Sequence, residues 1–247
     1  MKGILVPDSK VVKSFLRRHR FERSAENSGT FLSNKLHDVV VVSGAIGEKS
    51  YEVALKLVEN YSPDFIISVG FASSLRDEVP IGTVILCEKL ISLSGPMALW
   101  SNESAKSLDV PICRPLQSLF DNLDHKGRTF IKDGLVSAPE IVSNEKMKSW
   151  FGKELGSAVM DREGALVAEA CSKTGVPFAL IRGVTSARSS TISTFNQKLE
   201  IVGQPVAFRL LLSPDKLPAL LAFRFRRRKA VRKLNQVVSR IHSLSLP

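Results

Sequence analysis

Two carboxylates and an arginine stand together where a predicted strand ends. The short apolar run Ala158–Met160 is followed by Asp161, Arg162 and Glu163. The next segment, Gly164–Thr174, is rich in Ala, Leu, Val and Glu, which predicts a helix. Sites in open α/β sheets lie outside the carboxyl ends of strands, so this cluster is a candidate site for a polar ligand. The same acids would also cap the helix, and position alone does not separate the two interpretations.

A second polar strand end follows this helix. The run Phe178–Val184 is apolar except for Arg182, which is typical of a strand covered on both faces. Thr185 and Ser186 come directly after it. The two runs and the helix between them therefore form a strand–helix–strand unit with polar side chains after each strand.

Two turns of small residues follow predicted strands nearer the N-terminus. Gly44–Gly47 lies between the strand Asp38–Ser43 and a helix that begins at Glu48. Such a turn suits close approach of a ligand, and free helix amides bind anions. It lacks the GxGxxG and GK[ST] patterns of dinucleotide and Walker loops. A similar small-residue loop, Gly70–Ser74, is expected after the strand Asp64–Val69.

Two more strand ends carry candidate residues. Asp8 is the only carboxylate near the end of the strand Gly3–Val6, although it would equally serve as a helix N-cap. The segment Ser137–Val142 follows the strand Ile131–Val136. Strands and helices thus alternate along the chain, which predicts an α/β fold.

Two segments are less regular. Prolines break the pattern over 92–129, so we expect an irregular excursion there, such as a lid or an oligomer contact. A helix over 198–212 is weakened by a glycine and a proline. We divide the chain into a main domain over 1–212 and a C-terminal helical segment over 213–247.

Composition narrows the class of protein. A chain of 247 residues with 44% hydrophobic content is long enough for one large globular α/β domain. The three cysteines are widely spaced and the four histidines are scattered, so we expect neither a disulfide framework nor a metal site. The N-terminal apolar stretch is too short for a signal peptide, and no run is long enough to span a membrane. We expect a cytoplasmic protein.

The net charge of +11 is concentrated near the C-terminus. Nine Lys and Arg residues, and no Asp or Glu, follow Asp215. Leu217–Leu244 predicts a basic amphipathic helix, because Val231, Leu234 and Val238 recur at helical spacing. One interpretation is that its apolar face packs on the sheet and its arginines are solvated. The other is that it contacts an anionic surface.

Three segments resemble the superfamily of purine nucleoside phosphorylases and methylthioadenosine/S-adenosylhomocysteine nucleosidases. Val39–Leu86 resembles the family's strand, glycine turn, helix and "G-x-A-G-G-L … iGDvv" run. GLVSAPEIV (Gly134–Val142) is the second segment. In the third, MDREGALVAEAC stands in place of "VDMEgaAva" and GVPFALIRGVTS in place of "gvPf..iR.iSD". The resemblance covers roughly residues 1 to 190.

This resemblance implies a fold, an activity and a site. The fold is a three-layer α/β/α sandwich around a mixed, partly closed sheet in a homo-oligomer, without a cofactor. The chemistry is cleavage of the N-glycosidic bond of a nucleoside. Glu163 matches the family's ribose-binding carboxylate, and Asp8 lies near the position of a water-activating Glu. The resemblance further implies substrate contacts at Gly44, Gly47, Gly70, Phe71, Ala72, Ser73, Ile141, Val142, Asp161 and Arg162.

Two departures from the family pattern bear on the reaction. The phosphate-holding Arg and Ser of phosphorylases are replaced by Ser68 and Phe71, so water is the expected acceptor. The leaving-group Asp is replaced by Ser186, and serine is a poor proton donor at neutral pH. General acid help is worth roughly 10²–10⁴-fold in rate. The alternative is therefore a catalytically impaired relative that binds a nucleoside or a lipid.

The C-terminal run also resembles the tail of hopanoid-associated phosphorylase-like proteins, which are implicated in removing adenine from adenosylhopane. That resemblance implies a lipid-linked adenine nucleoside as substrate and a peripheral position at the inner membrane face through residues 216–244. Nucleic acid is not expected as a partner, because the tail offers only Phe223 and Phe225 for base stacking.

Overall fold

The longest apolar runs of the sequence form the centre of one mixed sheet. β4 (Val39–Ser43) holds four valines, and β1 (Lys2–Val6) pairs with it in parallel. The other edge of β1 pairs with β5 (Phe65–Ser74), also in parallel. Most side chains of these strands are buried whichever face they point to, as continuous apolar runs require.

The computed structural model describes residues 1–7, 9–23, 31–34, 38–124, 129–140, 142–189, 217–241 and 243–244, apart from the side chains of Lys10, Arg23 and 217–224. Two candidate site residues, Asp8 and Ile141, lie outside the described residues. So does the helix expected over 198–212.

Half of the sheet closes on itself. β5 pairs with β10 and β9, β10 pairs with β6, and β8 joins β6 to β9. On the other side of β5 the order continues through β1, β4, β3 and β2, while β7 pairs with the outer part of β6. The prediction of a mixed, partly closed sheet is confirmed. The remaining strand bounds are β2 (Glu22–Arg23), β3 (Phe31–Asn34), β6 (Val84–Leu93), β7 (Ala105–Leu108), β8 (Phe130–Ser137), β9 (Val159–Asp161) and β10 (Phe178–Ser186).

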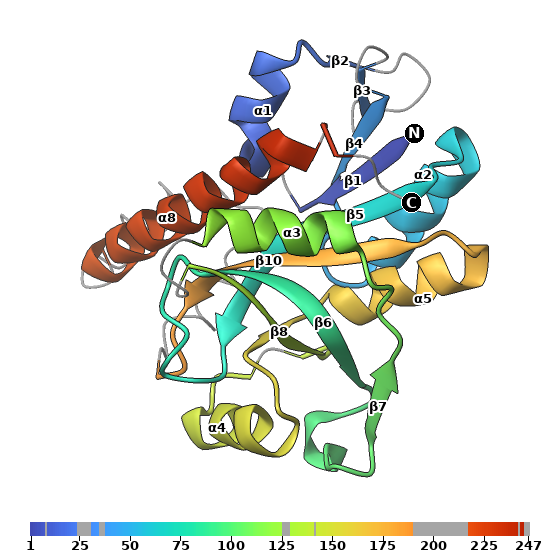
Figure 1. Ribbon diagram of the computed structural model, residues 1–247. Coiled ribbons are helices and arrows are strands. Elements are labelled where there is room, and N and C mark those ends of the chain that lie inside the picture. The colour runs from blue at the N-terminus through green and yellow to red at the C-terminus, as the bar shows by residue number, and fades with distance from the viewer. Residues whose placement is uncertain are drawn as a thin grey trace.

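Helices cover both faces of this sheet and make the outer layers of the predicted sandwich (Figure 1). α2 (Lys49–Tyr61) and α5 (Gly164–Thr174) pack side by side on one face. The opposite face carries η1 (Ser9–Val12), α1 (Lys13–Arg18), α3 (Arg114–Leu123) and α8 (Leu217–Ile241). α4 (Glu145–Glu154) and the short η3 (Met97–Leu99) pack with a third cluster near the ends of β6 and β8.

The long basic helix α8 packs its apolar side on the sheet. Leu234 and Ala230 lie against Gly183 of β10, where an added Cβ would come within 2.9 Å of Leu234. Val237, Val238 and Ile241 are also buried. The prediction that the apolar face of this helix packs on the sheet is therefore confirmed. Most of its described cationic side chains are exposed to solvent.

Two sequence-based expectations were wrong. The small residues Gly70–Ser74 continue β5 instead of forming a loop, because β10 and β9 satisfy their backbone on both sides. The segment 92–129 is more regular than its prolines suggested and includes β7 and α3. Pro115 lies in the first turn of α3, where a missing N–H costs nothing. Within the described residues, no helix has both the length and the apolarity of a membrane span.

Candidate functional site

The strand register places the candidate strand ends side by side. Ser186 of β10 is opposite Ser73 of β5, and Ser73 is opposite Met160 of β9. The Ser186 hydroxyl donates a hydrogen bond of 2.7 Å to the Ser73 hydroxyl. Both side chains are buried. Because β9 leads directly into the charged cluster, this register brings Ser186 and the cluster to one region of the sheet.

Glu163 joins the charged cluster to the glycine turn after β4. Its Oε1 accepts a hydrogen bond of 3.1 Å from the Gly47 amide, and its Oε2 accepts one of 3.4 Å from the Arg162 amide. The turn can approach so closely because Gly44 and Gly47 have φ values of 100° and 53°, which favour glycine. A carboxylate is thus held by two backbone N–H groups at the carboxyl ends of β4 and β9.

The pKa of the Glu163 carboxyl group lies well above that of an ordinary glutamate. Its pKa is raised to about 7, because burial and, to a smaller extent, the nearby Asp161 carboxylate outweigh the opposing effects of Arg182 and the two N–H donors. A carboxyl group that titrates near neutrality in a partly buried site is a frequent mark of a functional residue.

Asp161 is held differently. Its carboxylate is fully buried and accepts a hydrogen bond of 2.6 Å from Nε of Arg182, as well as two from the Gly164 amide. Nη1 of Arg182 donates to the carbonyl and hydroxyl oxygens of Ser68. Gly70 lies beside this pair, and a Cβ there would be 3.4 Å from the guanidinium, within van der Waals contact. The pair therefore fixes β5, β9 and β10 relative to one another.

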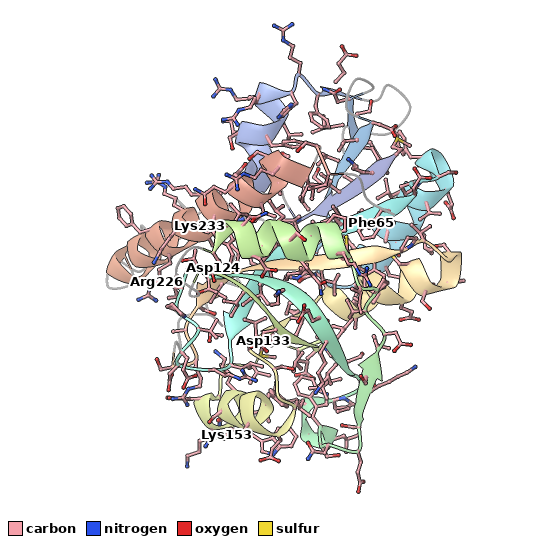
Figure 2. The ribbon with its side chains drawn as sticks, viewed as in Figure 1. Phe65, Asp124, Asp133, Lys153, Arg226 and Lys233 are labelled. Carbon is pink, nitrogen blue, oxygen red and sulfur yellow. The ribbon has the colours of Figure 1, made fainter. Side chains whose placement is uncertain are left out.

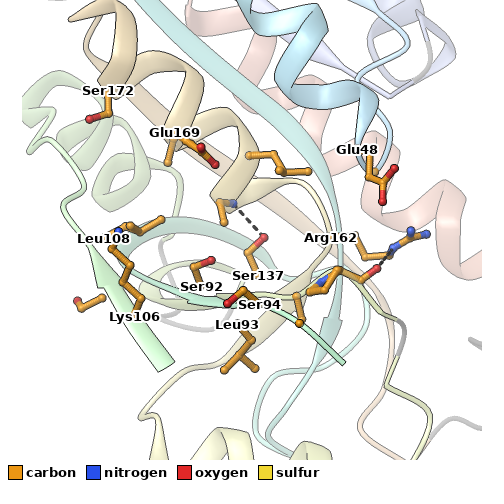
Figure 3. A pocket seen from close by; sticks show the side chains of 18 of the residues that line it. Glu48, Ser92, Leu93, Ser94, Lys106, Leu108, Ser137, Arg162, Glu169 and Ser172 are labelled. Atoms are coloured by element: carbon orange, nitrogen blue, oxygen red, sulfur yellow. Dashed lines mark hydrogen bonds between the residues drawn. The ribbon is translucent and has the colours of Figure 1, made fainter. Parts of the chain in front are cut away.

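Arg162 lies between the glycine turn and a cavity of about 850 Å³ (Figure 3). Its Nε donates a hydrogen bond of 3.0 Å to the Pro139 carbonyl, and its Nη2 lies 3.5 Å from where a Gly47 Cβ would be. The cavity wall combines apolar side chains such as Leu93, Leu108 and Leu166 with charged ones. Arg162 and Gly47 contribute to that wall, so the cavity begins next to Glu163.

Most of the chain matches a known protein family. Residues 2–210 match the sequence profile of the Phosphorylase superfamily. The chain belongs to the Phosphorylase superfamily. Members of this superfamily with curated names include two bacterial 5'-methylthioadenosine/S-adenosylhomocysteine nucleosidases. The protein of Buchnera aphidicola (strain Tuc7) is 25% identical over 179 residues, 68% of this chain and 76% of its own length. That of Shewanella halifaxensis is 24% identical over 156 residues, 60% of this chain and 68% of its own.

Solved structures show the same fold. A Helicobacter pylori 5'-methylthioadenosine/S-adenosylhomocysteine nucleosidase aligns with a TM-score of 0.72 and 18% identity, covering 98% of each chain. A futalosine hydrolase mutant of the same species aligns with a TM-score of 0.71 and 17% identity, covering 98% of this chain and 99% of its own. These similarities establish the nucleoside phosphorylase-like architecture.

Some of the site residues predicted from the sequence lie close together in the structure. Gly44, Gly47, Arg162 and Glu163 meet at one corner, with Ser73 and Ser186 at the neighbouring strand ends. Asp161 is close by, but its buried side chain contacts Arg182 and has no exposed surface for a ligand.

Three other candidates have their side chains in the packing clusters of the sheet. The Phe71 ring packs with the cluster under α8, and the Arg227 guanidinium lies 5.0 Å from its centroid. Val142 is buried with α4 in the third cluster. Ala72 is buried on the face that carries α2 and α5. The side chains of Phe71 and Val142 are thus placed in packing contacts.

Two residues of the site region were missed by the sequence-based assignment. Arg182 interrupts an otherwise apolar strand, and a lone charge in such a run signals a buried partner. Ser137 accepts a hydrogen bond of 2.9 Å from the Ala165 amide and so ties β8 to the first turn of α5. Arg188, two residues after Ser186, forms ion pairs with Asp77 and Glu145.

Proposed function

We propose that this protein hydrolyses the N-glycosidic bond of an adenine nucleoside. The observation that carries the proposal is the Glu163 carboxylate, held by the Gly47 and Arg162 amides where β4 and β9 end. Its negative charge would stabilise the positive charge that develops on the ribose as the bond to the base breaks. The nucleosidase names of the curated relatives support the same reaction class.

Water is the proposed acceptor in place of phosphate. The positions that carry Arg and Ser in phosphorylases are Ser68 and Phe71 here. The Ser68 oxygens already accept hydrogen bonds from Arg182, and Phe71 packs toward α8. Neither side chain is a cationic donor that could hold a phosphate ion.

We further propose that the nucleoside carries a lipid. The resemblance of the C-terminal tail supports this substrate, as do the apolar side chains of Leu93, Leu108 and Leu166 in the wall of the cavity beside Arg162. An apolar substituent would bury surface there at roughly 25 cal/mol per Å².

A second candidate function, binding without turnover, is favoured by Ser186. Its hydroxyl is buried and donates to Ser73, so it offers a leaving purine no acidic proton. Glu163 would then contribute to ligand binding only.

Adenine release tests the two candidates. The purified protein would be incubated with adenosine, methylthioadenosine or an adenosyl-lipid, each with and without phosphate, and free adenine would be measured. We expect phosphate-independent release that falls by roughly 10³-fold or more in Glu163→Gln, because the variant keeps the shape and loses the charge. Glu52→Gln is the matched control, since that exposed glutamate lies on α2 and does not line the cavity.

The outcomes separate hydrolysis from binding. Release that requires phosphate would contradict the choice of water as acceptor. No release from any of the substrates, with tight binding of one of them by calorimetry, would replace the hydrolase by the binding protein.

A further inference from the structure

The packing of α8 leaves one stripe of the helix facing solvent. Ala230, Leu234, Val238 and Ile241 are buried against the sheet. On the opposite side, exposed residues recur every three to four positions, as one helical face requires: Phe225, Arg228, Lys229, Arg232, Gln236 and Arg240. Four of these six side chains are cationic.

α1 lies beside α8 and extends this charged face. The Ser14 hydroxyl donates a hydrogen bond of 2.5 Å to the Asn235 side chain, whose amide nitrogen donates to the Val11 carbonyl. Figure 1 shows the two helices next to each other, and Figure 2 places Arg226 and Lys233 along α8. The α1 segment adds four exposed cations to the same side of the molecule: Lys13, Arg17, Arg18 and Arg20.

We name the resulting patch the α1–α8 basic surface. It consists of Lys13, Arg17, Arg18, Arg20, Arg228, Lys229, Arg232 and Arg240. Neither helix contains an Asp or Glu. Within the described part of the chain, none of these eight cations forms an ion pair, whereas Arg76, Lys132 and Arg188 elsewhere are all paired with carboxylates. The cations are therefore available to an anionic partner.

An exposed aromatic residue indicates which anionic partner fits. Phe225 is 65% exposed at the N-terminal end of the stripe. The helix sequence before it, Leu217–Phe223, contains no charged residue. A helix that joins an apolar end to a basic face is typical of proteins that lie on anionic lipid. Nucleic-acid grooves instead place several aromatic side chains along a basic path.

The apolar end of α8 lies at the same end of the sheet as the candidate site. The Arg227 guanidinium stacks on Phe71 near the end of β5. The Lys229 side chain packs on Gly82, whose amide donates to the Val184 carbonyl in β10. Contact with a bilayer through this end would bring the strand ends of the site close to the lipid.

We propose that the α1–α8 basic surface docks the protein on an anionic lipid bilayer, with Phe225 entering the interface. This inference goes beyond the nucleosidase proposal, and its test measures no turnover. Each Lys or Arg near an anionic bilayer strengthens partition by roughly fivefold, so four substitutions should weaken binding by roughly 100-fold or more. The attraction should weaken as salt is added.

Vesicle co-sedimentation of the full-length protein tests the inference. Vesicles would contain phosphatidylcholine alone or phosphatidylcholine mixed with phosphatidylglycerol. The test variant replaces Arg228, Lys229, Arg232 and Arg240 by Gln. The matched control replaces four exposed lysines on other faces, Lys49, Lys56, Lys146 and Lys153, and removes the same charge. Thermal unfolding would show that both variants fold.

We expect wild-type binding to the anionic vesicles only, retained in the control variant and lost in the test variant. Tryptophan emission of Phe225→Trp should shift to shorter wavelength when anionic vesicles are added. Three results would overturn the inference: no binding of the wild type, equal loss in both quadruple variants, or binding to an RNA oligonucleotide without any binding to vesicles.

Discussion

Asp161 and Glu163 are one residue apart, yet their carboxylates have different partners. Asp161 is buried and receives the Arg182 guanidinium at 2.6 Å and the Gly164 amide. Among the described residues, Glu163 accepts hydrogen bonds from the backbone N–H groups of Gly47 and Arg162, and its pKa is raised to about 7. The Asp161 carboxylate is thus neutralised by a fixed cation, whereas no ion pair is formed by Glu163 within the described part of the chain. Two carboxylates in contrasting environments are typical of a division between structural and reactive roles.

The largest effect should come from removing the buried ion pair between Asp161 and Arg182. Asp161→Ala leaves the Arg182 guanidinium buried without its counter-charge, which should cost about 3–5 kcal/mol of unfolding free energy. Urea denaturation measures the loss. The double variant Asp161→Leu, Arg182→Met should recover most of it, because apolar side chains of similar size remove both charges together. A loss below about 1 kcal/mol in the single variant would contradict a structural role for Asp161.

The contrast also shows which parts of the fold were predictable. α5 was predicted over its full range, because apolar content, Gly175 and Pro177 all indicate the same helix end. The length of β5 was not, since Gly70–Ser74 resemble a loop until their pairing partners are known. β4, in contrast, was predictable from its own run of four valines, without knowledge of its pairing partners. The sequence therefore predicts an element correctly where its apolar pattern and its end signals indicate the same structure. It does not predict an element whose length depends on pairing with strands that are distant in sequence.

The candidate site was predictable to a similar degree. Glu163, Gly44 and Gly47 follow from their motifs, and the structure brings them together. The partner of Asp161 did not follow, because Arg182 lies 21 residues away in sequence and meets it only through strand pairing. The direction of the Phe71 side chain depends on which face of β5 carries α8, and sequence alone does not supply that.

A substitution at Ser186 tests whether this position can supply a proton to the leaving group. Ser186→Asp places a carboxyl group where Ser186 now donates to Ser73, in a buried position that favours the protonated acid. A positioned general acid should raise adenine release by roughly 10²-fold. Steady-state kinetics would measure the gain, with Ser186→Asn as the control of similar size and no acidic proton. Equal rates in both variants would contradict a leaving-group role for this position.

The raised pKa of Glu163 predicts that kcat/KM depends on pH, with a smaller effect than that of the Ser186 substitution. The proposed role requires the ionised carboxylate, so kcat/KM should rise about tenfold per pH unit below pH 7 and level off above it. The residual activity of Glu163→Gln should lack this rise, because the amide does not titrate. A wild-type profile that is flat between pH 6 and 8 would mean that Glu163 does not ionise in the active range.

The same titration should also change stability, by a smaller amount. The folded-state pKa of Glu163 lies above that of a free carboxyl group, so the native protein binds the proton more tightly than the unfolded chain does. Stability contributed by this group is therefore present at low pH and lost as pH rises to about 7. Glu163→Gln should stabilise the fold by on the order of 1 kcal/mol at pH 8 relative to wild type, and by much less at pH 5. Thermal melts at both pH values would measure this. A variant that is less stable at pH 8 would show that the hydrogen bonds from Gly47 and Arg162 outweigh the burial of charge, and Glu163 would then join Asp161 as a structural carboxylate.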